Sequence, residues 1–225
     1  MAEMTLSEAM YTARAIRRLR PDPVPDEIIG KVLDAAIRAP SGSNAQSWLF
    51  VVAKDASQRQ RLGAVYKKAS SILVKLYSGR ERPAHMEERQ YERFMASVTH
   101  LFEHMGDAPV IIVPCLRSSL WTGAGNLPED IKKRMQGSVR LAGSSIYPAV
   151  QNIILACRAH GLGTVLTTIH AFYEEEVHEI LNLPDDVQSY AMMPVGYPQG
   201  HFGPVKRRPV NEVACLDRYG NPWKA

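Results

Sequence analysis

The segment Pro109–Cys115 (PVIIVPC) constrains the fold most, because it is an apolar run without a charged residue. A strand in which polar and apolar residues do not alternate is covered on both faces. A second segment, Trp48–Ala53 (WLFVVA), has the length and composition of another buried strand. The sequence therefore predicts a sheet that lies between other layers of structure.

Amphipathic segments with helical spacing surround these two strands. The predicted helices span Thr5–Ala13, Glu27–Arg38, Ser57–Tyr77, Glu87–Met105, Gln136–His160 and Tyr173–Leu181. Asp26 and Ser57 have side chains suited to capping the second and third of them. Two further strands are predicted at Thr164–Ile169 and Ser189–Tyr197. Because helices and strands alternate, the fold class is α/β or α+β, with helices covering a sheet.

The position of the positive charge matters, because the net charge of +4 and the pI of ≈ 9.0 are compatible with a nucleic-acid binder. One basic cluster lies within Arg14–Arg20 and another is Lys206–Arg208. A nucleic-acid groove more often shows a longer stripe with interleaved aromatic residues. Two small clusters suit one compact anion, such as a phosphate, if the fold brings them together. Solvation of both clusters on the surface is the alternative.

Other features argue against a membrane or secreted protein. No run of about 18 apolar residues is present, so no membrane span is expected. The first residues include Glu3 and Glu8 and lack the pattern of a signal peptide. Cys115, Cys157 and Cys215 lie far apart, which disfavours a disulfide scaffold or a structural zinc site. We therefore expect a cytoplasmic protein.

No motif supplies an obvious nucleophile, metal centre or acid–base pair. His100 and His104 fit the H-x-x-E-H pattern of zinc enzymes, but no third ligand stands out, and a solvated helix face is the favoured interpretation. Gly123 and Gly125 lack the remaining glycine and the preceding strand of a dinucleotide fingerprint. No metal site is predicted. If the chain is an enzyme, a bound cofactor is expected to supply the chemistry.

Several motifs follow one another along nearly the whole chain. They are Arg14–Pro25, Ala39–Trp48 (APSGSNAQSW), Tyr147–Ala156, Gly161–Thr164, Met193–Pro198 and Lys206–Arg208. In this order and at this spacing they resemble the nitroreductase family of FMN-dependent enzymes. Residues 78–136 match none of these motifs.

The resemblance implies an α+β fold of the nitroreductase type, in which helices flank a central, mostly antiparallel sheet. It implies a single FMN-binding domain over residues 1–225, with residues 78–136 as a variable lid or insertion. It also implies a homodimer, in which a C-terminal extension reaches onto the partner subunit. FMN would then lie at the interface, in sites built from both subunits.

The resemblance also assigns cations to the cofactor. Arg14, Lys206 and Arg208 correspond to the family's contacts with the FMN phosphate. Arg17 falls where the family places a cation beside the flavin pyrimidine edge, where it would stabilise negative charge on reduction. The Arg-Arg-Ser frequent in the family reads Ala13-Arg14-Ala15 here, so Arg18 or backbone N–H groups are alternative phosphate contacts.

Two segments correspond to the family's flavin loops. One approaches the flavin and its ribityl chain, and the other turns backbone N–H groups toward flavin N5. The residues so assigned are Pro40, Ser41, Gly42, Ser43, Asn44 and Gln46 in the first, Leu166, Thr167 and Thr168 in the second, and Ala15 in the N-terminal motif.

The implied activity is an oxidoreductase in which NADH or NADPH gives hydride to flavin N5 and leaves. A nitroaromatic, a quinone or a related electron-poor acceptor then takes its place. No residue of the chain is assigned as catalytic. Tyr91, Phe102 and Trp121 either stack over the substrate or pack the helices.

Two alternatives remain open at this point. One is specialised flavin chemistry within the family, such as reductive dehalogenation or flavin fragmentation. The other, more remote, is a basic nucleic-acid-binding protein without enzyme activity. The predicted partners are a small-molecule acceptor and a second subunit, rather than nucleic acid or a membrane.

Overall fold

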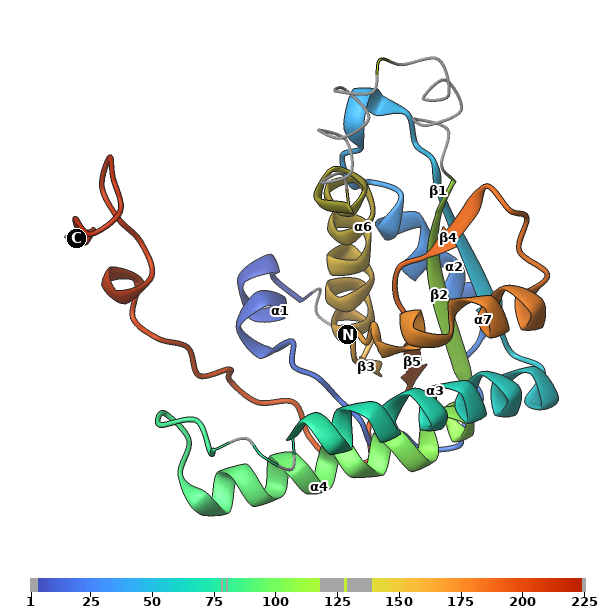
Figure 1. Ribbon diagram of the computed structural model, residues 1–225, viewed down its shortest axis with the longest axis horizontal. Coiled ribbons are helices and arrows are strands. Elements are labelled where there is room, and N and C mark those ends of the chain that lie inside the picture. Colours follow the sequence, from blue (N-terminus) through green and yellow to red (C-terminus); the bar gives the residue numbers. More distant parts are fainter. Residues whose placement is uncertain (1–3, 78, 80, 118–127, 129–138, 224–225) are drawn as a thin grey trace.

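The computed structural model describes residues 4–77, 79, 81–117, 128 and 139–223 (Figure 1). Within these residues the strands form one antiparallel sheet, in the order β1-β2-β5-β3, with β4 also paired to β2. The strands are β1 (Trp48–Ala53), β2 (Val110–Arg117), β3 (Gly163–Thr164), β4 (Val187–Ser189) and β5 (Met193–Gly196). The central position of β2 explains its continuous apolar sequence.

Burial of β2 on both faces is confirmed. Every residue from Val110 to Leu116 is buried. Successive side chains of a strand point to opposite faces. Val110 and Ile112 accordingly enter one hydrophobic core, whereas Ile111 and Val113 enter a second.

Helices cover both faces of the sheet (Figure 1). The first core is closed by α2 (Asp26–Ala36) and α6 (Val139–Ala159). The second is closed by α3 (Ala56–Tyr77), α4 (Glu88–His104) and α7 (Glu174–Leu181). The α+β class and the helix-flanked antiparallel sheet are therefore confirmed.

The single strand predicted at Ser189–Tyr197 is wrong, because β4 and β5 are separate. Cys115 pairs with Ser189, and Ile112 pairs with Met193. The paired positions are thus three residues apart on β2 but four residues apart on the neighbouring segment. One extra residue on one strand is a β-bulge. Pro114 lies at this point and has no N–H to donate, although its carbonyl accepts a hydrogen bond from the Tyr190 N–H (2.9 Å).

The strand predicted at Thr164–Ile169 is also shorter than expected. It is reduced to β3 and an isolated bridge between Thr167 and Met192. A 3₁₀ helix, Ile169–Tyr173, follows at once and leads into α7. Thr167 therefore lies on a short irregular segment between two regular elements.

The two predicted helix caps are wrong as well. Asp26 is the first residue of α2, and Pro25 precedes it without a side-chain cap. Asp55, rather than Ser57, accepts the Gln58 backbone N–H (2.9 Å) at the start of α3. A carboxylate there satisfies an otherwise unpaired N–H and interacts favourably with the helix dipole.

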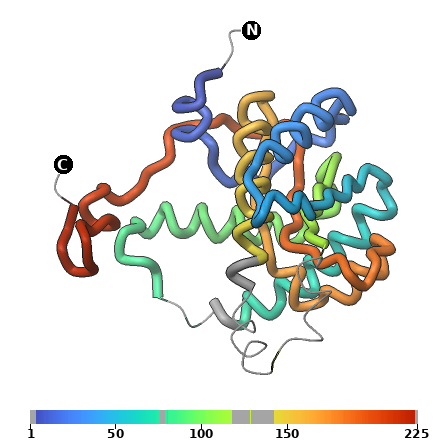
Figure 2. Tube along the Cα trace, turned by 90° about the horizontal axis from the view of Figure 1, so that it is seen from above, coloured from blue at the N-terminus to red at the C-terminus, as the bar shows by residue number. Residues whose placement is uncertain are grey.

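The C-terminal tail runs antiparallel to the segment that follows α1 (Leu6–Thr12). The Gln199 N–H donates to the Arg18 carbonyl (3.0 Å), and the Val205 N–H donates to the Tyr11 carbonyl (2.9 Å). Figure 2 shows the tail passing beside α1 before it turns away from the rest of the chain. The two ends of the sequence, with their basic clusters, thus share one edge of the molecule.

Two further observations bear on the environment of the chain. No helix among the described residues is long and apolar enough to cross a membrane. Cys115 and Cys157 are buried, Cys215 is exposed, and all three are free thiols.

Candidate functional site

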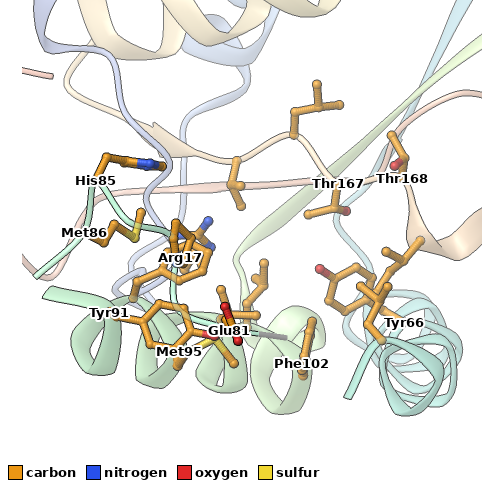
Figure 3. Close-up of a pocket in the computed structure, with 18 residues that line it drawn as sticks. Arg17, Tyr66, Glu81, His85, Met86, Tyr91, Met95, Phe102, Thr167 and Thr168 are labelled. Atoms are coloured by element: carbon orange, nitrogen blue, oxygen red, sulfur yellow. The ribbon is translucent and has the colours of Figure 1, made fainter. Parts of the chain in front are cut away.

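A cavity of about 600 Å³ lies between α3, α4 and the segment Val165–Ile169 (Figure 3). The helices provide mainly aromatic and apolar walls, among them Tyr66, Leu73, Tyr91, Phe94, Met95, Val98, Leu101 and Phe102. Arg17 enters from the N-terminal segment, and Glu81, Pro83, His85 and Met86 enter from the segment before α4. The cavity is thus an apolar space with a few polar groups at its walls, which is typical of small-molecule sites.

This cavity brings together six residues that the sequence singles out for cofactor or substrate: Arg17, Leu166, Thr167, Thr168, Tyr91 and Phe102. They come from three separate parts of the chain. Trp121, the third predicted substrate contact, lies outside the described residues.

Arg17 and Arg18 have different surroundings. The Arg17 guanidinium lies 5.5 Å from the centroid of the Phe94 ring, at the wall of the cavity. Burial lowers the pKa of Arg17, Tyr66 raises it, and the charge of Arg14 lowers it further. Arg18 instead donates to Nδ1 of His100 (3.1 Å). Of the two neighbours, only Arg17 presents its charge to the cavity.

The segment after β3 is held by two hydrogen bonds to Met192, the residue before β5. The Thr167 hydroxyl donates to the Met192 carbonyl (2.6 Å), and the Met192 N–H donates to the Thr167 carbonyl (2.9 Å). Thr168 follows as an exposed residue at the start of the 3₁₀ helix. Both threonines lie on the side of the cavity opposite α4 (Figure 3).

A buried histidine lies directly behind this segment. His170 is fully buried, and its Nε2 lies 3.1 Å from the Ser189 hydroxyl, whereas Nδ1 has no hydrogen-bond partner among the described residues. Glu174 accepts the Ser189 backbone N–H (3.1 Å). Burial lowers the pKa of His170 from 6.5 to about 4, and the contact with Ser189 opposes this shift. The imidazole is therefore neutral near pH 7.

His170 should make the stability of the protein depend on pH. Its pKa is lower in the folded than in the unfolded chain, so between pH 6.5 and about 4 the unfolded chain binds more protons and stability rises with pH. Because of this group, we expect the free energy of unfolding to be about 2 kcal/mol lower at pH 5 than at pH 7. Urea unfolding at both pH values measures it. In His170→Leu, the difference in unfolding free energy between the two pH values should be smaller by this amount. A difference as large as in the wild type would contradict the role given to His170.

The loop predicted to approach the flavin has a strained backbone. Ser43, Asn44 and Gln46 have φ angles of 53°, 53° and 52°, a region that residues other than glycine rarely adopt. All three side chains are exposed. The Ser41 hydroxyl accepts the Gln46 N–H (3.0 Å), which closes the turn. Strain of this kind concentrates at ligand-binding segments.

This loop and the N-terminal segment contact opposite ends of α6. The Gly42 N–H donates to the Ser145 hydroxyl (3.0 Å) near the start of the helix, whereas Arg158, near its end, contacts Thr12. Thirteen positions separate these two helical residues, or about 20 Å along the axis. None of the described residues Pro40–Gln46 lines the cavity that Arg17 borders.

The predicted phosphate cations lie on the edge where the tail meets the N-terminal segment. Arg14, Lys206 and Arg208 are all exposed. None of them makes an ion pair with a residue that the structure describes. Lys206 directly follows Val205, which is hydrogen-bonded to Tyr11. Ala15 lies between Arg14 and Arg17 and is also exposed. Unpaired cations on neighbouring segments fit an anionic group.

His100 and His104 lie on one face of α4, with their rings stacked at 4.4 Å. Nδ1 of His100 accepts from Arg18, while Nδ1 of His104 lies 2.7 Å from Asp107. Burial, followed by the charge of Arg18, lowers the pKa of His100. Among the described residues, no group of three or more His, Cys, Asp or Glu side chains is arranged to hold a metal.

Sequence reasoning missed several walls of the cavity. Tyr66, Met86 and Met95 line it, yet the sequence marks Tyr66 and Met95 only as apolar positions of amphipathic helices. Glu81 and His85 bring polar groups from a segment that carries no recognisable motif. No signal in the sequence distinguishes a helix face that borders a cavity from one that packs into the core.

Residues 11–197 match the sequence model of the Nitroreductase family. The chain belongs to the nitroreductase family. NADH dehydrogenase of Thermus thermophilus is 27% identical over 219 residues, which cover 91% of this chain and 92% of that protein. Iodotyrosine deiodinase of Danio rerio is 26% identical over 219 residues, which cover 93% of this chain and 68% of that protein.

The fold agrees with membership of the nitroreductase family. The crystal structure of oxidized iodotyrosine deiodinase bound to FMN and 3-iodo-L-tyrosine superposes with a TM-score of 0.67 at 24% identity. The superposition covers 96% of this chain and all of the other. The family match includes Arg14, Arg17 and the 166–168 segment, but not Lys206 or Arg208.

Proposed function

We propose that this member of the nitroreductase family is an FMN-dependent oxidoreductase that uses NADH or NADPH to reduce an electron-poor acceptor, such as a nitroaromatic or a quinone. The observation that carries the proposal is the cavity in which Arg17 and the 166–168 segment meet aromatic walls. Support comes from the relative named NADH dehydrogenase and from the structural neighbour that binds FMN.

The residues present suit FMN. The exposed cations Arg14, Lys206 and Arg208 would hold the phosphate by charge-assisted hydrogen bonds. Arg17 would lie against the flavin and favour its negatively charged reduced form. The chemistry that FMN supplies when bound is hydride transfer through N5, which explains why the chain itself needs no acid–base pair.

We further propose that the chain works as a homodimer. The loop Pro40–Gln46 is bonded to Ser145 near the start of α6, whereas the segment before Arg14 is bonded to Arg158, about 20 Å further along the helix axis, which favours a loop supplied by another subunit. A second subunit would supply the loop to each site. The exposed tail, with Val210, Val213 and Trp223, offers apolar side chains for the partner surface. This arrangement suits the C-terminal extension expected from the family resemblance.

Residues 78–136 are proposed as the variable lid of a single domain. Their described part, from Glu81 through α4, contributes Met86, Tyr91, Met95 and Phe102 to the cavity. These side chains would therefore select the acceptor. Because all three cysteines are free thiols, we propose the reducing cytoplasm as the location.

Reductive dehalogenation is the second candidate function. A relative named iodotyrosine deiodinase shares 26% identity over nearly the whole chain, and a neighbour of that name shares the fold. Both candidates require FMN and use the same cavity. They differ in the acceptor, which the residues before and within α4 would contact.

The purified protein tests the proposal directly. We expect a yellow protein whose flavin spectrum is bleached by NADH or NADPH without oxygen and restored by an acceptor. A panel with a nitro compound, a quinone and 3-iodo-L-tyrosine separates the two candidate functions. A protein that remains colourless after FMN is added would reject both.

A further inference from the structure

Arg158, in the last turn of α6, joins three elements at one point. Its side chain is only 13% exposed. Nε donates to the Thr12 hydroxyl (2.8 Å), and a terminal nitrogen lies 3.6 Å from the Glu8 carboxylate. The guanidinium carbon lies over the Phe202 ring, 4.3 Å from its centroid. This one side chain therefore holds both α1 and the C-terminal tail against α6.

The two segments that Arg158 holds carry Arg14, Lys206 and Arg208, which have no ion pair with a residue that the structure describes. Thr12 precedes Arg14 by two residues, and Phe202 precedes Lys206 by four. Next to these points, the Val205 N–H donates to the Tyr11 carbonyl (2.9 Å). Without the anchor at Phe202, the tail beyond Gln199 would have this single backbone bond to α1. The distance between Arg14 and Lys206 thus depends on Arg158.

The contacts use properties that only a guanidinium combines. It donates to the Thr12 hydroxyl and faces the Glu8 carboxylate with separate nitrogens, while its carbon lies over the Phe202 ring. A lysine ammonium retains the charge opposite Glu8 but has no planar face. The Thr12 hydroxyl is itself fixed, because it donates to the Glu8 carbonyl (2.6 Å). Arginine can therefore make all three contacts at once, each with a different part of the guanidinium.

We propose that Arg158 is a positioning residue for the phosphate end of the cofactor, which it serves by holding Arg14 and Lys206 at one place without contacting the phosphate. The proposal rests on the proposed FMN function. It predicts that loss of Arg158 weakens recognition of the phosphate specifically, and leaves recognition of the flavin ring unchanged.

The test compares FMN with riboflavin, which lacks the phosphate. Both are titrated into the flavin-free full chain, and the ratio of their dissociation constants measures recognition of the phosphate. We expect Arg158→Met to lower the preference for FMN at least ~10-fold, as for loss of one hydrogen bond to a charged group. Lys206→Met removes a proposed phosphate contact, and its loss of preference for FMN is the reference against which Arg158→Met is compared. Arg38→Met removes an arginine with a carboxylate partner on α2 and should retain the preference.

Conservative variants separate positioning from charge. Arg158→Lys should lose much of the preference, because one ammonium cannot reproduce the separate guanidinium contacts with Thr12, Glu8 and Phe202. If Arg158→Met does not fold, Phe202→Leu and Thr12→Val remove one contact each and should each lower the preference. An unchanged preference in these variants, or equal weakening of both flavins, would overturn the proposal. Wild-type protein that binds neither flavin would reject the proposed function itself.

Discussion

Replacing Arg17 by methionine is expected to slow the reduction of bound FMN by NADH or NADPH about 100-fold. The guanidinium lines the cavity and is partly withdrawn from water, so its charge is screened less than that of a surface arginine. Removing one group that stabilises charge developing in a transition state typically costs about 10²–10³-fold in rate. Anaerobic stopped-flow absorbance, normalised to bound flavin, measures the effect.

Arg18→Met is the matched control for this prediction. It removes the same charge from the next residue, but Arg18 is bonded to His100 and does not line the cavity. The rate of flavin reduction should therefore stay within a few-fold of the wild-type value. If Arg18→Met is slow and Arg17→Met is not, the cation beside the flavin has been assigned to the wrong residue.

Gly63→Ala is expected to destabilise the protein by about 2 kcal/mol, the overpacking cost less the gain in helix propensity. A Cβ at this position of α3 would lie 2.7 Å from the Gly106 nitrogen and 2.8 Å from its Cα. Both are backbone atoms, so neither moves aside as the end of a flexible side chain would. Alanine gains about 1 kcal/mol of helix propensity, but overpacking of a close contact costs more, up to about 3 kcal/mol and occasionally beyond. Urea unfolding measures the difference.

Gly30→Ala is the same substitution at another helical glycine, and we expect it to change the stability in the opposite direction. Gly30 lies within α2, and no atom is within 4 Å of the added Cβ. This variant should therefore be more stable than the wild type by about 1 kcal/mol. Equal effects of the two substitutions would mean that the close approach of α3 to Gly106 is not as tight as the structure has it.

The regular parts of the fold are predictable from local patterns. The range Trp48–Ala53 agrees with β1, and the apolar run after Pro109 agrees with β2. The predicted strands are wrong where a residue distant in the sequence determines where a strand ends. The break between β4 and β5 lies opposite Pro114, which is more than 70 positions earlier in the chain. No pattern within Ser189–Tyr197 could reveal that interruption.

The site shows the same division. Motifs single out Arg17, Thr167 and Thr168, and these residues do meet at one cavity. The choice between Arg17 and Arg18 cannot be read from two adjacent arginines, because it depends on Phe94 and His100 of α4. Tyr66 and Met95 occupy apolar helix positions like many others. Only the packing of α3 beside α4 makes them walls of a cavity.

The sequence by itself determined the family, the cations and the two buried strands, because each depends on residue type and short-range spacing. Tertiary structure decided how those residues are grouped. It paired the tail with the segment after α1 and fixed both against Arg158. It also placed the loop Pro40–Gln46 at the far end of α6. Distances between residues remote in sequence follow from how helices and strands pack, and a helix as long as α6 separates its two ends by a length that no local pattern encodes.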